Sequence, residues 1–80
     1  MPNNARERPR MAKEFTLDRE VYTAAALQQA RKDFASLCQV TVRPTNAAFH
    51  VTITPLTETP YLADEFLNYA LGISIQELLT

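Results

Sequence analysis

Polar and apolar residues alternate along this chain with two periods, one typical of strands and one typical of helices. Phe15 and Leu17 alternate with polar neighbours over residues 13–18, which predicts a short strand with one buried face. Further on, apolar residues recur at steps of three or four: Leu27, Ala30, Phe34 and Leu37. This spacing places them on one stripe of an amphipathic helix, for which Thr23 is the predicted N-cap.

Two more alternating segments flank a turn at residues 44–47. Each has an apolar row: Cys38, Val40 and Val42 in the first, and Phe49, Val51 and Ile53 in the second. Pro44 and Asn46 suit the turn, since proline presets φ and asparagine tolerates a left-handed conformation. The pattern predicts a β-hairpin whose register is fixed, because a slip by one residue would turn one apolar row outward.

A second helix is predicted to start at Thr59 and Pro60, as N-cap and first helical residue, and to run to about Leu71. Gly72, the single glycine of the chain, then suggests a left-handed cap at its C-terminal end. Directly afterwards, residues 74–77 have the Ser-x-x-Glu spacing of a capping box, which predicts a further short helix.

The order strand, helix, strand, strand, helix predicts an α+β fold: a small two-layer β-α-β-β-α domain. We expect a three-stranded sheet in which the third strand is central and antiparallel to both neighbours, with both helices on one face. The predicted domain covers residues 13–80 and follows a disordered basic leader over residues 1–12.

Charge is uneven along the 80 residues, although the net charge is only −1. Residues 1–13 hold four basic residues and one acid, a net charge of +3, whereas the remainder holds four basic residues and eight acids, a net charge of −4. No aromatic residue lies between the leader arginines, so a base-stacking nucleic-acid site is not expected. The single cysteine and the lack of an apolar signal or membrane segment predict a cytoplasmic protein without membrane contact.

Few side chains of this sequence are candidates for catalysis or metal binding. Cys38 and His50 are the only soft metal ligands, too few for a zinc site, and the alternation places them on opposite faces of the sheet. We expect Cys38 to be buried and His50 to lie beside Thr41 on the polar face. Asp64 and Glu65 suit the first turns of a helix, where the macrodipole favours acids. No catalytic residue, metal or cofactor is therefore predicted.

The second helix has more apolar surface than a single sheet should cover, and only a narrow polar strip. An apolar surplus on a small domain commonly marks a partner or homodimer interface, although the core could also use it. The predicted partner-binding residues are Leu62, Glu65, Phe66, Asn68, Tyr69 and Ile73.

The chain also resembles the HxsD-like family, small accessory proteins of systems that modify His-Xaa-Ser peptides. The resemblance covers roughly residues 15–77. It rests on Tyr22 before an alanine-rich helix that ends Asp33-Phe34, on the Val-Thr-Ile-Thr-Pro strand at 51–55, and on Glu-Phe-Leu-Asn-Tyr-Ala-Leu at 65–71. It implies a non-catalytic binding role beside a radical-SAM maturase, a precursor peptide or both, with Glu65 and Asn68 as recognition positions.

Two other hypotheses stay open at this point. One is a homodimeric structural or regulatory domain in which the second helix packs on its own copy. The other is a small subunit that completes the active site of a partner enzyme through His50. For the accessory role, we expect contact through the second helix and through a sheet edge that could take up an extended peptide.

Overall fold

A computed structural model of the chain describes residues 12–79. The elements follow in the predicted order: β1 (Lys13–Asp18), α1 (Ala24–Asp33), β2 (Cys38–Pro44), β3 (Ala48–Pro55) and α2 (Leu62–Leu79). The leader predicted over residues 1–12 lies outside the described residues, apart from the exposed Ala12.

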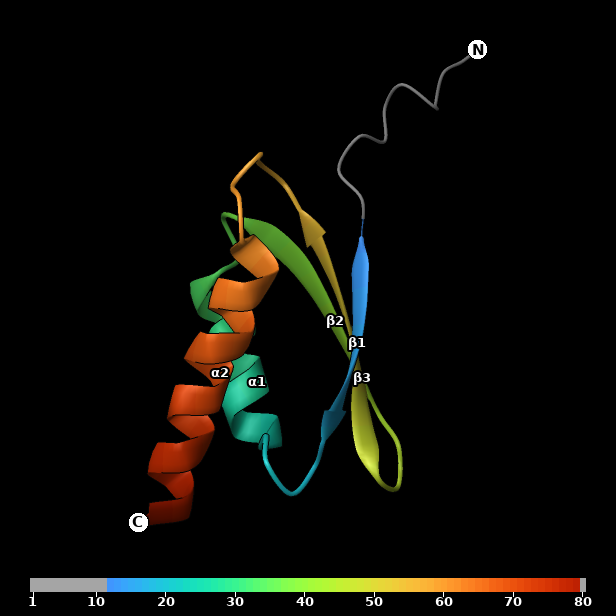
Figure 1. The fold of residues 1–80 in the computed structure, drawn as a ribbon, viewed down its shortest axis with the longest axis vertical. Coiled ribbons are helices and arrows are strands. Elements are labelled where there is room, and N and C mark those ends of the chain that lie inside the picture. The colour runs from blue at the N-terminus through green and yellow to red at the C-terminus, as the bar shows by residue number, and fades with distance from the viewer. Residues whose placement is uncertain (1–11, 80) are drawn as a thin grey trace.

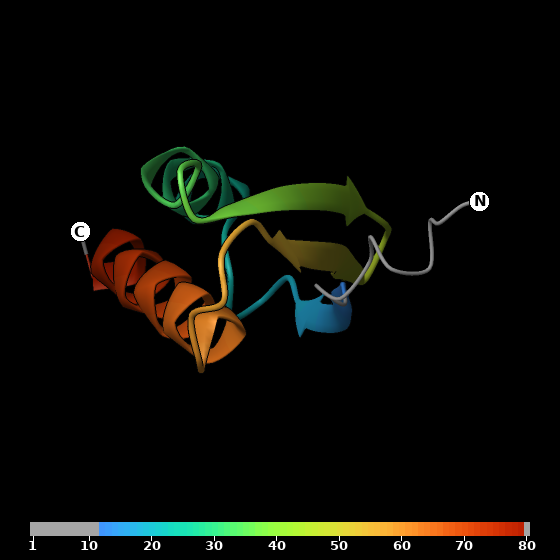
Figure 2. The same ribbon diagram turned by 90° about the horizontal axis from the view of Figure 1, so that it is seen from above.

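The three strands form one sheet in the order β1-β3-β2, and both outer strands run antiparallel to β3. Val51 of the central strand is opposite Phe15 of β1 and Val42 of β2, so the apolar rows of all three strands share one face. Both helices lie on that face, with α1 beside β2 and α2 beside β1 (Figures 1 and 2). The predicted α+β fold and the central position of β3 are confirmed.

The core lies between the sheet and the two helices. Its largest fully buried side chains include Leu27 of α1, Ile53 of β3 and Phe66 of α2, each 0% exposed. Phe34 closes the gap between the helices, because its ring meets that of Phe66 edge-on at a centroid distance of 5.4 Å. The prediction that Leu37 belongs to the same stripe is wrong: α1 ends at Asp33, and Leu37 lies beyond it as an exposed residue.

Helix α1 begins as the sequence predicts. Thr23 has an extended backbone, and its side-chain oxygen accepts a hydrogen bond from the Ala26 N–H at 3.0 Å. This bond satisfies one of the donors that every helix leaves free in its first turn. Arg31 and Lys32 occupy the last turn, where the macrodipole favours cations.

The predicted start of α2 is wrong by two residues. The helix begins at Leu62, and Tyr61 before it has a φ of 60°, in the left-handed region. The Tyr61 carbonyl accepts the Glu65 N–H at 2.9 Å and so begins the helical bonding. Thr59 does not cap the helix, since its hydroxyl pairs with that of Thr57 at 2.7 Å.

The predicted break at Gly72 is also wrong, because α2 continues through it to Leu79. Gly72 does not have a positive φ, so it makes no left-handed cap. Ser74 is fully buried and donates from Oγ to the Ala70 carbonyl at 2.9 Å, as a residue in a helix interior can. Ser74 and Glu77 do not cap a new helix but bond to Thr23. Ser74 Oγ accepts the Thr23 N–H at 3.1 Å, and the Glu77 carboxylate accepts the Thr23 hydroxyl. The Ser-x-x-Glu pair therefore serves the start of α1.

Candidate partner-binding surfaces

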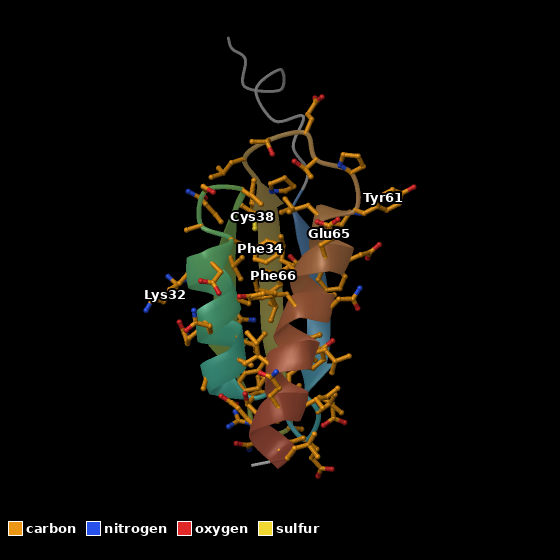
Figure 3. The ribbon with its side chains drawn as sticks, turned by 90° about the vertical axis from the view of Figure 1, so that its left-hand side faces the viewer. Lys32, Phe34, Cys38, Tyr61, Glu65 and Phe66 are labelled. Atoms are coloured by element: carbon orange, nitrogen blue, oxygen red, sulfur yellow. The ribbon has the colours of Figure 1, made fainter. Side chains whose placement is uncertain are left out.

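The six predicted partner-binding residues of α2 separate into three groups: two are buried, Glu65, Asn68 and Tyr69 are exposed, and Ile73 is half-buried. Leu62 and Phe66 are 2% and 0% exposed and belong to the core, so they are not surface contacts in this structure. Figure 3 shows Phe66 directed inward between the helices. Glu65 and Asn68 are exposed and lie on the solvent side of the helix. The apolar width of α2 is thus largely explained by contact with both the sheet and α1.

Tyr69 joins the two helices. Its hydroxyl donates to the Asp33 carboxylate, and its ring lies 5.4 Å from that of Phe34. The hydrogen bond from Tyr69, aided by one from Gln29, lowers the pKa of Asp33, because it favours the charged carboxylate. The same bond to Asp33 raises the pKa of Tyr69. Tyr69 is 41% exposed, yet its polar atom already has a partner within the chain.

An exposed apolar surface lies further along α2. Most of its residues follow Gly72, where the sequence predicted that the helix would end. Ile75, Leu78 and Leu79 are 47%, 64% and 79% exposed. With the half-buried Leu71 they follow helical spacing, and we call these four residues the C-terminal stripe. The last turns of α2 extend past α1 (Figure 1). A continuous helical period from Leu67 through Leu78 was the signal for this stripe in the sequence.

The outer edge of β2 presents unpaired backbone. Two hydrogen bonds show which residue pairs of the hairpin are hydrogen-bonded: Thr45 N–H to the Ala48 carbonyl and Leu56 N–H to the Leu37 carbonyl, both at 2.8 Å. Antiparallel partners alternate between bonded and non-bonded pairs, so positions 39, 41 and 43 of β2 bond to β3. The peptide groups of Val40 and Val42 consequently point away from β3, where the described sheet has no further strand.

The position of Pro44 agrees with this alternation of bonded and non-bonded pairs. It lies at a non-bonded position, where its missing N–H would face outward from the sheet. At the β1 edge, the Arg19 N–H bonds to the Ala47 carbonyl at 3.4 Å, so the odd-numbered residues of β1 are the ones that bond to β3. The peptide groups of Glu14 and Thr16 therefore point away from the sheet. The described sheet therefore has two open edges, and they differ in their surroundings.

A groove of about 680 Å³ runs beside the β2 edge. Its walls come from the flank of α1 and the turn after it, and from the strand itself: Gln28, Arg31, Lys32, Ala35, Cys38, Gln39, Val40 and Thr41. Figure 3 shows Lys32 on the side of α1 that faces away from α2. The groove thus combines an open strand edge with a polar helical wall, a geometry suited to an extended chain.

The helical wall carries positive charge. Arg31 and Lys32 are both exposed, and Arg31 donates to the Gln28 side chain at 3.3 Å. The Asp33 carboxylate, which accepts hydrogen bonds from Gln29 and Tyr69, also attracts Lys32 and so offsets part of this charge. Neither cation forms an ion pair with an acid among residues 12–79.

The opposite face of the sheet is polar and holds His50. His50 lies on this polar face as predicted, directly opposite Thr16 of β1 and Arg43 of β2, and Thr41 is its diagonal neighbour on β2. Thr16 Oγ1 is 3.4 Å from His50 Nδ1, and the two line a shallow depression of about 400 Å³. Cys38 lies on the helix-covered face, as predicted, and burial raises the pKa of its thiol.

Three further findings concern the chain as a whole or its described part. In the described part of the chain, no group of His, Cys, Asp and Glu side chains is arranged to hold a metal ion. Over the same residues, no helix combines the length and apolar character needed to cross a membrane. Comparison of the chain with protein-family models, curated proteins and solved structures gives no match in any of the three.

Proposed function

We propose that this protein is a non-catalytic accessory protein that binds an extended peptide segment of its partner at the β2 edge. The observation that carries the proposal is the outward direction of the Val40 and Val42 peptide groups beside a groove walled by α1. A bound strand would satisfy these groups through main-chain hydrogen bonds, which supply affinity with little demand on sequence.

The class of partner follows from the resemblance to the HxsD-like family. Its support is the Glu-Phe-Leu-Asn-Tyr-Ala-Leu segment at 65–71 and the Val-Thr-Ile-Thr-Pro strand at 51–55. On this basis the segment bound belongs to a radical-SAM maturase or to its ribosomal precursor peptide, and the complex works in the cytoplasm. Glu65 and Asn68 are exposed on α2 and so are available as a second contact.

Selection from a random-peptide display library tests the proposed edge. Val40→Pro removes an outward N–H without removing a bond to β3, so it should abolish binding of the peptides that the wild type selects. Thr16→Pro is the control for the loss of an outward N–H, because it removes the corresponding group at the β1 edge, although Thr16 is exposed and Val40 is buried. Circular dichroism of both variants checks that the fold is retained. Equal loss in both variants, or none in Val40→Pro, would contradict the proposal.

A homodimer is the second candidate, and the C-terminal stripe of α2 favours it. Apolar side chains exposed on adjacent turns are typical of a contact surface, and Leu78 is 64% exposed. Light scattering at micromolar concentration distinguishes the candidates. A dimer that Leu78→Asp converts to a monomer would support self-association, whereas a wild-type monomer would exclude this candidate.

A further inference from the structure

We infer that the peptide held at the β2 edge is acidic, with Asp or Glu at alternate positions that face Arg31 and Lys32. This inference rests on the proposed function, since it names the chemistry of the segment that the edge binds. It follows from three features of the groove: the direction of the free peptide groups, the spacing of strands in a sheet, and the charge of the α1 flank.

The direction of the backbone fixes where a bound strand would lie. Bonds to the Val40 and Val42 peptide groups place it in the plane of the sheet, about 4.8 Å beyond β2. Successive side chains of a strand point to opposite faces. Every second side chain of the peptide would therefore point to the helix-covered face, into the groove that Gln28, Arg31 and Lys32 line.

The positive charge of the α1 wall favours acidic side chains at the peptide positions that face the groove. Arg31 and Lys32 lie one after the other on α1, and both line the groove without an ion-pair partner among residues 12–79. Their long side chains can reach carboxylates across the groove. An acidic peptide complements this wall, and a basic peptide would meet like charge.

A second copy of the chain does not fit the same edge. Because α1 lies beside β2 (Figure 2), antiparallel pairing of two β2 strands about a two-fold axis would make the α1 helices of both copies neighbours on one face of the joined sheet. Arg31 and Lys32 of one copy would then face the same residues of the other. Facing like charges disfavour this pairing, so the groove is better matched to a partner of opposite charge.

The test uses the peptides that bind wild type and lose binding to Val40→Pro, labelled for fluorescence anisotropy. We expect them to be enriched in Asp and Glu and to bind more weakly as salt rises. Replacing Arg31 and Lys32 together by Gln should weaken binding by about 2- to 5-fold for each lost pair, as for exposed ion pairs. Lys13→Gln, a neutralised cation on β1 outside the groove, should leave affinity unchanged.

The outcomes separate this inference from the proposed function. Peptides that require the β2 edge but show no excess of acids, or bind the double Gln variant as well as wild type, would overturn the acidic specificity and leave peptide capture intact. If no selected peptide is sensitive to Val40→Pro, both fail. Should Val40→Pro not fold, amide exchange of Val40 in wild type, with and without a selected peptide, decides the same question.

Discussion

The backbone N–H of Thr23 bonds to the Ser74 hydroxyl at 3.1 Å, across 51 residues of sequence. Thr23 thereby has three roles at the start of α1: its N–H reaches α2, its Oγ1 caps Ala26, and its hydroxyl donates to Glu77. Because Ser74 is fully buried, this junction holds the start of α1 against the second half of α2.

Ser74→Ala should destabilise the protein by about 1–3 kcal/mol, because it leaves the Thr23 N–H without its acceptor in a partly buried site. Urea denaturation followed by circular dichroism measures this loss. Ser36→Ala is the matched control, since Ser36 is exposed and lies outside the helices. Equal stability of the two variants would show that the Thr23–Ser74 bond does not hold the helices together.

Gly72→Ala should stabilise the protein by about 0.5–1 kcal/mol, because alanine favours a helix interior and restricts the unfolded chain. The added Cβ would meet no atom within 4 Å, and Gly72 does not have a positive φ. Thermal unfolding checks the sign of the change. A lower melting temperature would indicate that α2 ends at Gly72 in solution, as the sequence pattern alone suggests.

Phe66→Ala should cost about 3–5 kcal/mol, as is usual when a large aromatic side chain is removed from a core. Phe66 is 0% exposed and packs edge-on against Phe34, so a domain of this size should lose most of its stability. Leu79→Ala, at a residue that is 79% exposed, should leave the unfolding midpoint nearly unchanged. A stable, native Phe66→Ala protein would instead place Phe66 on the surface.

Stability should depend on pH through Asp33 and Tyr69. The lowered pKa of Asp33 contributes stability above the unfolded value of about 3.9, and this is lost as pH falls through the lowered folded value. The raised pKa of Tyr69 contributes below the unfolded value of about 10, and this is lost as pH rises through the folded value.

Tyr69→Phe removes the hydrogen bond and should therefore flatten the stability profile at both ends of the pH range. Denaturation midpoints measured across the range test this, with Tyr61→Phe as the control, because Tyr61 is 76% exposed and its hydroxyl bonds to no residue of the described chain. An acid limb that keeps its steepness in Tyr69→Phe would assign the lowered pKa of Asp33 to another cause.

The strands and α1 could be predicted from the sequence because their signals are local. Alternation alone assigned Val40, Val51 and Ile53 to the buried face, and the observed register joins them in one core. Thr23 could be identified as an N-cap for the same reason, since its bond to the Ala26 N–H spans only three residues.

The second half of α2 could not be predicted in this way. Gly72 and the Ser-x-x-Glu spacing are local signals for a helix end and a new start, but tertiary contacts override them. Ser74 and Glu77 bond to Thr23, which is distant in sequence, and these bonds stabilise the continuation of α2 beyond Gly72. Free strand edges also depend on sheet order and hydrogen-bond phase, so the β2 groove is visible only in the assembled fold.

Amide hydrogen exchange at β2 tests peptide capture most directly. In the free protein, the Val40 and Val42 amides should exchange rapidly, while those of Thr41 and Arg43, bonded to β3, should be protected. A selected acidic peptide should slow exchange at Val40 and Val42 and leave Glu14 and Thr16 of the other edge unchanged. Rapid exchange at Val40 and Val42 in the saturated complex would contradict binding at this edge.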